Sequence, residues 1–380
     1  MPQRVTDLPT PALIVDLDRV EANLRRGRAY AGAQGVDLRP HAKTHKSPRF
    51  AQAQIDAGAA GICVAKLGEA ELMADAGVAD IVVPNTVIGP DKAARAVALA
   101  QRVRFAIGVD HPEQVAQLAA AAAGATTPLA ILVEVDVGAG RGGAPAAEVA
   151  DLLRRVREAS GLKAGGLRAR GVYAYEGFTY GARDVGELVV RHDEAQRALL
   201  AVANAVRPWL DGDGRRGGAP VVSLGSTPSL LAAVPLRPGI TEMRPGTYLF
   251  NDLQQARWAG ASGDWRDGLE HAAAHVLASV VSMRGDRAIL DAGSKSLTSD
   301  RAVGHDGHGL LVDHGLTVAR LSEEHGVVEG PGVERLRVGD KVRVLMNHVC
   351  PVVNLFPVMH LLRGDEVVEV LGVSGRGLLV

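Results

Sequence analysis

The chain has 380 residues, of which 47% are hydrophobic and 22% are charged, and its formal net charge is -1 at pH 7. This length suits one barrel-sized domain and a smaller one. The balanced charge offers nucleic acid no basic surface, and the sequence lacks an apolar run typical of a membrane span or a signal peptide. We therefore expect a cytoplasmic protein that binds neither nucleic acid nor membranes.

The first part of the chain has the pattern of a barrel. From Val36 to about Arg244, short aliphatic runs alternate with Ala-rich segments of helical spacing, which is typical of parallel strands joined by crossover helices. Gly89-Pro90 and His111-Pro112 each predict a helix start. Eight units favour a closed (β/α)8 TIM-type barrel over an open sheet, because eight parallel strands can close without edges. The predicted strands are residues 36–40, 61–65, 80–84, 104–109, 130–137, 170–175, 221–225 and 240–243.

The remainder of the chain has a different texture. Beyond about Phe250, short alternating runs are separated by Gly-Asp and other Gly-rich turns, which predicts a compact antiparallel β-domain. The segment 12–16 precedes the barrel and could pair with that domain. We expect a barrel over residues 20–250 and a β-domain over residues 251–380 together with residues 1–19. Predicted strands of the β-domain include residues 275–281, 288–290, 341–344 and 366–371.

A cluster of Lys and His residues follows the first barrel strand. Lys43 lies in the segment RPHAKTHK, residues 39–46, and the carboxyl ends of barrel strands face the active site. A lysine withdrawn from water there loses its proton more readily and can attack an aldehyde to form an imine. A solvated basic loop explains the same residues about equally well.

A segment of small residues, SLGSTPS at 223–229, follows the seventh barrel strand and opens a helical stretch. Small residues let backbone N–H groups approach an anion, and barrels often bind phosphate after strands seven and eight. The eighth unit continues into the segment RPGTY, residues 244–248. We favour a phosphate site here over an ordinary loop with an N-cap serine. A lysine on one side of the barrel mouth and a phosphate site on the other indicate pyridoxal 5'-phosphate.

The segment NHVCP at 347–351 lies in the predicted β-domain. If it is a strand, His348 and Cys350 point to the same side and can share one ion, and imidazole with thiolate suits zinc. Two ligands leave positions open for water or substrate, as a catalytic metal requires. On its own, however, an H-x-C pair is more often a buried cysteine beside a structural histidine. The only other cysteine, Cys63, is expected to pack in the core.

In chain order, several motifs resemble the family of D-threonine aldolases and D-serine dehydratases, and the resemblance covers nearly the whole chain. These motifs are TPA at 10–12, RPHAK at 39–43, EVDVG at 134–138, GST at 225–227, DAG at 291–293, EHG at 324–326 and HVC at 348–350. That family has the alanine-racemase-like fold, in which a pyridoxal-phosphate barrel is followed by a β-domain that carries metal ligands. The fold commonly forms homodimers.

The resemblance implies a role for ten residues. Lys43 matches the Schiff-base lysine, and Arg141 and Tyr175 match residues that contact the cofactor ring. His348 and Cys350 match the ligands of a divalent metal, which we expect to be Zn²⁺, with Mn²⁺ and Mg²⁺ as alternatives. The phosphate cradle is matched by Gly225, Ser226, Thr227, Gly246 and Tyr248.

Two details bear on the reaction. The dehydratases resemble this chain in using His-x-Cys, whereas the aldolases carry Asp where this chain has Cys350. The aldolases also place a histidine after the tyrosine of strand six, where this chain reads EGFTYG at 176–181; Glu176 at its start could line the substrate pocket. We therefore expect dehydration of a D-3-hydroxy amino acid such as D-serine or 3-hydroxy-D-aspartate. The alternatives are retro-aldol cleavage to glycine and an aldehyde, racemisation, which needs no metal pair, and a non-catalytic pyridoxal-phosphate carrier.

Overall fold

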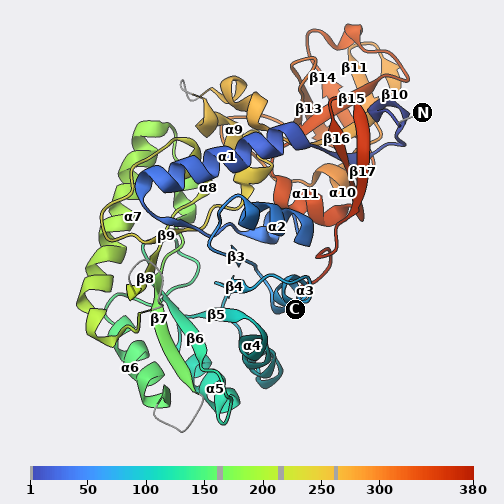
Figure 1. The fold of residues 1–380 in the computed structure, drawn as a ribbon. Coiled ribbons are helices and arrows are strands. Elements are labelled where there is room, and N and C mark those ends of the chain that lie inside the picture. The colour runs from blue at the N-terminus through green and yellow to red at the C-terminus, as the bar shows by residue number, and fades with distance from the viewer. Residues whose placement is uncertain (1–2, 161–165, 213–217, 261–263) are drawn as a thin grey trace.

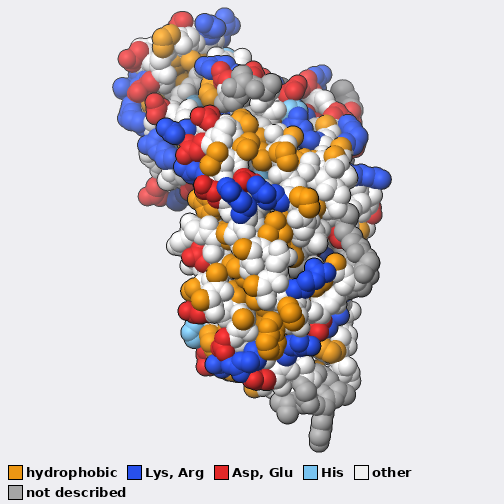
Figure 2. Space-filling view, turned by 90° about the vertical axis from the view of Figure 1, so that its left-hand side faces the viewer, with side chains coloured by type: hydrophobic (Ala, Val, Ile, Leu, Met, Phe, Trp, Pro, Cys, Tyr) orange, Lys and Arg blue, Asp and Glu red, His pale blue; other side chains and the backbone are white. Residues whose placement is uncertain are grey.

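The computed structural model describes residues 3–160, 166–212, 218–260 and 264–380. It consists of a parallel barrel and an antiparallel β-domain, with helices α10 (Ser294–Leu297) and α11 (Val349–Leu355) near the junction between them (Figure 1). Within the described ranges, no helix is long and apolar enough to cross a membrane. On the face shown in Figure 2, Lys and Arg side chains lie among acidic and apolar side chains and form no continuous basic patch.

Eight parallel strands form the barrel, and each overlaps a predicted strand. Their order is β2-β9-β8-β7-β6-β5-β4-β3. Between the two end strands, the Cys63 N–H donates to the Pro40 carbonyl at 2.7 Å and a bridge joins His41 to Cys63, which closes the ring. The expected (β/α)8 barrel is therefore confirmed. The strands are β2 (Asp37–Leu38), β3 (Ile62–Cys63), β4 (Asp80–Val83), β5 (Arg104–Val109), β6 (Leu129–Glu134), β7 (Leu167–Tyr173), β8 (Val221–Ser223) and β9 (Glu242–Met243).

Helices connect and cover these strands, and local signals set their starts. Gly89 precedes α4, and His111 caps α5 by accepting the Glu113 N–H at Nδ1 over 3.1 Å, as the two Pro-containing motifs predict. The first helix, α1, is followed by Gly35, whose φ of 66° suits a residue without a Cβ atom. The helices are α1 (Leu17–Gln34), α2 (Pro48–Asp56), α3 (Leu67–Asp75), α4 (Pro90–Arg102), α5 (Pro112–Ala122), α6 (Val149–Ser160), α7 (Val185–Ala205), α8 (Thr227–Leu231) and α9 (Leu253–Ala259).

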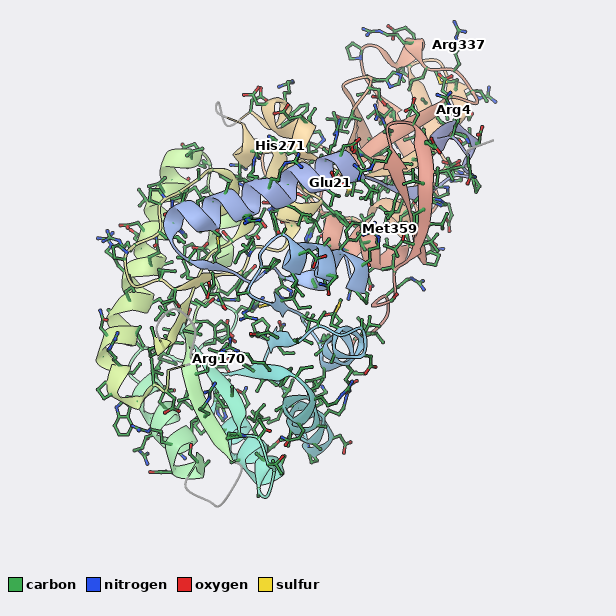
Figure 3. All side chains as sticks on the ribbon, in the orientation of Figure 1. Arg4, Glu21, Arg170, His271, Arg337 and Met359 are labelled. Carbon is green, nitrogen blue, oxygen red and sulfur yellow. The ribbon has the colours of Figure 1, made fainter. Side chains whose placement is uncertain are left out.

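The interior of the barrel contains an apolar layer and a layer of charges. Cys63 is fully buried in the apolar layer, so the expectation that it packs in the core is confirmed. In the charged layer, the Arg39 guanidinium lies 2.7 Å from Asp80 and 2.6 Å from Glu242. Arg170 of β7, labelled in Figure 3, lies 3.9 Å from Asp80. These charges are buried with partners, as burial in a low dielectric requires.

The β-domain is a nine-stranded sheet with the order β11-β14-β13-β12-β15-β10-β1-β16-β17, in which β10 also pairs with β11. The N-terminal strand β1 (Ala12–Asp16) pairs antiparallel with β10 and parallel with β16. The predicted pairing of segment 12–16 with this domain is therefore confirmed. The other strands are β10 (Ala274–Arg284), β11 (Arg287–Leu290), β12 (Gly309–Leu311), β13 (Leu316–Leu321), β14 (Gly326–Glu329), β15 (Lys341–Met346), β16 (Val358–Arg363) and β17 (Glu366–Gly372).

Candidate active site

A cavity of about 320 Å³ lies at the carboxyl ends of the barrel strands, and His348 and Cys350 of the β-domain contribute to its lining. Its walls come from the loops after β2, β4, β6, β7, β8 and β9, from α9, and from the start of α11. All but two of the ten predicted site residues line it, the exceptions being Thr227 and Tyr248. The structure therefore brings together groups that lie far apart in the sequence.

Lys43 lies in a short 3₁₀ turn (Ala42–Thr44) directly after β2, and α11 packs against this turn. His41 caps the turn, with its Nδ1 accepting the Lys43 backbone N–H at 3.4 Å. Burial, together with the nearby Lys43 and Arg244 cations, holds the pKa of His41 well below its usual range. The lysine amine therefore shares the cavity with a neutral imidazole.

The loops after β8 and β9 fit an anion. Gly225 has a φ of 133°, and a Cβ atom there would lie 2.8 Å from the Met243 Cβ, so only glycine suits this position. Ser226 and Gly246 line the same wall of the cavity, together with Thr247. Within the described part of the chain, the Thr247 hydroxyl is buried without a hydrogen-bond partner. An unsatisfied buried hydroxyl beside small residues fits a phosphate group.

Two residues expected in the phosphate cradle do not reach the cavity. The side chain of Tyr248 packs against Gly27 and its hydroxyl accepts a hydrogen bond from Gln54 at 3.2 Å, so Tyr248 belongs to the core. The reason is local, since the turn after β9 directs Thr247 and not Tyr248 to the cavity wall. Thr227 lies one residue behind Ser226, and its buried hydroxyl also lacks a partner among the described residues.

Aromatic rings and arginines form another wall. The Arg141 guanidinium lies 4.1 Å from the centre of the Tyr175 ring and 3.8 Å from Glu134. Arg244 lies 4.9 Å from the centre of the Tyr173 ring. Burial raises the pKa of Tyr175, although Arg141 partly opposes this. A protonated phenol and a guanidinium side by side suit the polar edge of a bound aromatic ring.

His348 and Cys350 lie together, but not on a strand as the sequence predicts. Strand β15 ends at Met346, His348 precedes α11 in an extended conformation, and Cys350 lies in the first turn of that helix. The Cys350 sulfur lies 3.2 Å from the Thr44 hydroxyl, which places it beside the turn that holds Lys43. The expected strand geometry is therefore wrong, although the expected juxtaposition is present.

The surroundings of His348 suit a cation. Its Nδ1 lies 2.7 Å from Asp300 Oδ2. Burial by itself lowers the pKa of His348, but Cys350, Asp252 and Asp300 outweigh it and raise the pKa to about 10. In the part of the chain that the structure describes, no group of three or more His, Cys, Asp or Glu side chains converges on a metal position. A metal bound by His348 and Cys350 would therefore keep positions for other ligands.

Several lining residues carry no distinctive sequence signal. Tyr180, Gln254 and Gln255 line the cavity, and burial raises the pKa of Tyr180, so this phenol remains a hydrogen-bond donor. Glu176, which the sequence already suggested as a pocket residue, lines it as well. Its buried partner His192 lies in the middle of α7 and could not be found from the sequence. Thr247 could have been found, since it directly follows Gly246.

Comparisons with known proteins agree with this arrangement. The family model described as "Alanine racemase, N-terminal domain" matches residues 15–254, and the one described as "Putative serine dehydratase domain" matches residues 273–362. The chain is 34% identical to a D-threonine aldolase from Arthrobacter sp., over 97% of this chain and 93% of the relative. It is 33% identical to D-threo-3-hydroxyaspartate dehydratase from Delftia sp., over 97% of this chain and 98% of the relative.

Solved structures of a D-threo-3-hydroxyaspartate dehydratase include two alanine variants. Both superpose on this chain with a TM-score of 0.85. The first is 29% identical, and the match covers 98% of this chain and 96% of the solved chain. The second is 30% identical, and the match covers 97% of this chain and 98% of the solved chain. One variant replaces a histidine, and the other, described as metal-free, replaces a cysteine two positions later. His348 and Cys350 have the same spacing.

Proposed function

The chain belongs to the family of D-threonine aldolases and D-serine dehydratases, and we propose that it is a pyridoxal-phosphate- and metal-dependent lyase that dehydrates a D-3-hydroxy amino acid. D-Serine and 3-hydroxy-D-aspartate are the proposed substrates. One observation carries the proposal, namely that Lys43 from the barrel and the His348 and Cys350 pair from the β-domain line a single cavity.

The cavity offers pyridoxal 5'-phosphate a covalent anchor and an anion site. The Lys43 amine would hold the cofactor, while Gly225, Ser226, Gly246 and Thr247 would surround its phosphate. When bound, the cofactor supplies an electron sink for the charge that develops at the substrate Cα. Arg141 and Tyr175 would border its ring.

His348 and Cys350 would hold the divalent metal, and imidazole with thiolate favours Zn²⁺. When bound, the metal polarises the β-hydroxyl of the substrate so that it leaves more easily. Asp300 accepts a hydrogen bond from Nδ1 of His348, so this nitrogen would keep its proton, and Nε2 would give up its own proton to bind the metal.

The side chains of the cavity have different roles in the proposed reaction. Lys43 would be the base that takes the Cα proton of the substrate. Burial and the cations around it lower the pKa of His41. Its imidazole therefore remains neutral and adds no positive charge to the cavity. Loss of the Cα proton and the β-hydroxyl removes one water, and hydrolysis then returns one, leaving a 2-oxo acid and ammonia.

Cys350 supports dehydration over aldol cleavage, because the chain resembles the dehydratases at this position. The segment 176–181 supports it too, since it lacks the histidine found in the aldolases that the chain resembles. The second candidate is retro-aldol cleavage. It is favoured by the 34% identity to a D-threonine aldolase, and the lysine and the metal pair would serve either reaction.

Product analysis separates these candidates. The purified protein is incubated with D-serine, D-threonine and 3-hydroxy-D-aspartate, with and without a chelator, and ammonia, 2-oxo acids, glycine and aldehydes are measured. We expect ammonia and a 2-oxo acid, and loss of both products with chelator. Release of glycine and an aldehyde without ammonia would instead assign the aldolase reaction, and retention of the cofactor without turnover would assign a carrier.

A pair of cysteine variants tests the metal site directly. Cys350→Ala should lose bound zinc and activity together. Cys63→Ala is the matched control, because Cys63 is buried in the barrel core and does not line the cavity. This control should keep the zinc content of the wild-type protein.

A further inference from the structure

A buried carboxylate in the cavity wall pairs with a buried imidazole behind it. Glu176 follows β7, lines the cavity, and is 1% exposed, while His192 of α7 is 0% exposed. The His192 Nδ1 lies 2.5 Å from the Glu176 Oε2. None of the steps proposed above uses this pair, and burying two such groups has a cost unless their hydrogen bonds are satisfied.

The hydrogen-bonding partners fix which nitrogen carries the proton. The His192 Nε2 is buried and, among the described residues, has no hydrogen-bond partner. A proton on Nε2 would leave a buried donor unsatisfied, whereas a proton on Nδ1 can be donated to the carboxylate. His192 therefore donates from Nδ1, and Glu176 is held as an oriented acceptor.

The other side of Glu176 contacts residues 225–229, which comprise the end of the loop after β8 and the start of α8 and which we call the phosphate loop. The Ser229 hydroxyl lies 3.4 Å from Glu176 Oε1 and 3.0 Å from the Ser226 carbonyl, and it accepts the Ser226 N–H at 3.0 Å. The Thr179 hydroxyl donates to the Glu176 carbonyl at 2.8 Å and lies 3.4 Å from the Ser226 hydroxyl. Both the side chain and the main chain of Glu176 are thus linked to the phosphate loop.

We propose that Glu176, held by His192, is a positioning residue that fixes the phosphate loop through Ser229. The Glu176 carboxylate and the Ser226 carbonyl share the single proton of the Ser229 hydroxyl, and the oxygen of this hydroxyl accepts the Ser226 N–H. Ser226 is thereby presented to the cavity in a fixed conformation, which lowers the cost of ordering the loop around an anion. The inference rests on the proposed function, because it takes the phosphate of the cofactor as the anion.

The test compares two ligands that differ only in the phosphate. Pyridoxal 5'-phosphate and pyridoxal are titrated by absorbance into the metal-loaded protein, and both can react with Lys43. His192→Phe removes the donor to Glu176, and Ser229→Ala cuts the link to the loop while leaving the buried pair intact. Because each variant loses about one hydrogen bond that orders the loop, we expect affinity for pyridoxal 5'-phosphate to fall about tenfold.

Two further variants serve as rescue and control. Glu176→Gln keeps an acceptor for His192, and its amide N–H can donate to the Ser229 hydroxyl, so its affinity should stay within about threefold of the wild type. Gln196→Leu alters a buried residue of the same helix that bonds instead to Pro235 and Arg237, and it should bind both ligands normally.

The outcomes are distinct. Loss of affinity for pyridoxal 5'-phosphate alone, in His192→Phe and Ser229→Ala, would support the positioning role. Equal loss of affinity for both ligands would mean that Glu176 and His192 are needed for folding in general. No loss of affinity would mean that they do not position the phosphate loop. Either result would overturn the inference. A wild-type protein that binds neither ligand would overturn the proposed function itself.

Discussion

The contact between His348 and Asp300 gives a sharp test of the proposed metal site. The His348 Nδ1 lies 2.7 Å from the Asp300 Oδ2, so the carboxylate orients the ring and increases the electron density on the nitrogen that would bind the metal. Asp300→Asn keeps the size of the side chain and removes its charge. The amide remains able to accept the hydrogen bond, but the bond is then no longer charge-assisted.

The exposure of His348 and Asp300 determines how much Asp300→Asn should weaken zinc binding. Losing such a carboxylate typically weakens metal binding by about 10- to 100-fold. The side chains of His348 and Asp300 are 38% and 46% exposed, and water screens the interaction of exposed charges. The lower end of the range therefore applies, and we expect the zinc dissociation constant to rise about tenfold.

Competition with a chromophoric chelator at fixed pH measures this constant. Asp313→Asn is the matched control, because Asp313 is an equally exposed carboxylate of the β-domain that pairs with Arg343 at 2.9 Å and does not line the cavity. It should bind zinc as the wild type does. If Asp300→Asn bound zinc as tightly as Asp313→Asn, the carboxylate would not support the ligand, and the assignment of His348 would be in doubt.

Three other predictions concern single residues. Burial lowers the pKa of His45 to about 4, so the unfolded state binds more protons than the folded state below about pH 6.5. About 3 kcal/mol of stability that is present above this pH is therefore lost as the pH falls to about 4. Denaturant titrations should show that the free energy of unfolding of His45→Gln depends less on pH. Burial raises the pKa of the Cys63 thiol to about 12, so a thiol reagent should modify Cys350 alone in the native protein after zinc removal, and both cysteines after denaturation. Gly225→Ala should lower the free energy of unfolding by about 2 kcal/mol, as measured by denaturant titration, because its φ is 133° and the new Cβ would meet Met243; unchanged stability would contradict this account of the loop.

The barrel could be predicted because its strands are buried on both faces and therefore stand out as aliphatic runs between helical segments. The prediction was least accurate at β7, which starts at Leu167 and not at Arg170. Arg168 and Arg170 interrupt the apolar pattern, although Arg170 is itself buried near Asp80. A pattern of hydrophobic residues misses a strand that carries a paired charge into the interior.

Much of the site could be predicted for a related reason. Strand ends converge at one side of a parallel barrel, so Lys43 and the loop after β8 had to lie near one another. Side chains brought in from helices follow no such rule. His192 lies in the middle of α7, and its contact with Glu176 depends on how that helix packs behind the loop after β7.

The sequence predicts correctly that His348 and Cys350 lie together, but it predicts the wrong local structure for them. Two residues separated by one position share a side of a strand, but they diverge within a helix. Here the pair stays together because His348 is still extended, and only Cys350 lies in the helix. Asp252, which precedes α9 and lies 97 positions earlier in the chain, accepts the Val349 N–H at 2.9 Å and so holds this junction. The geometry of the H-x-C motif therefore depends on contact between the barrel side and the β-domain, which the motif itself does not encode.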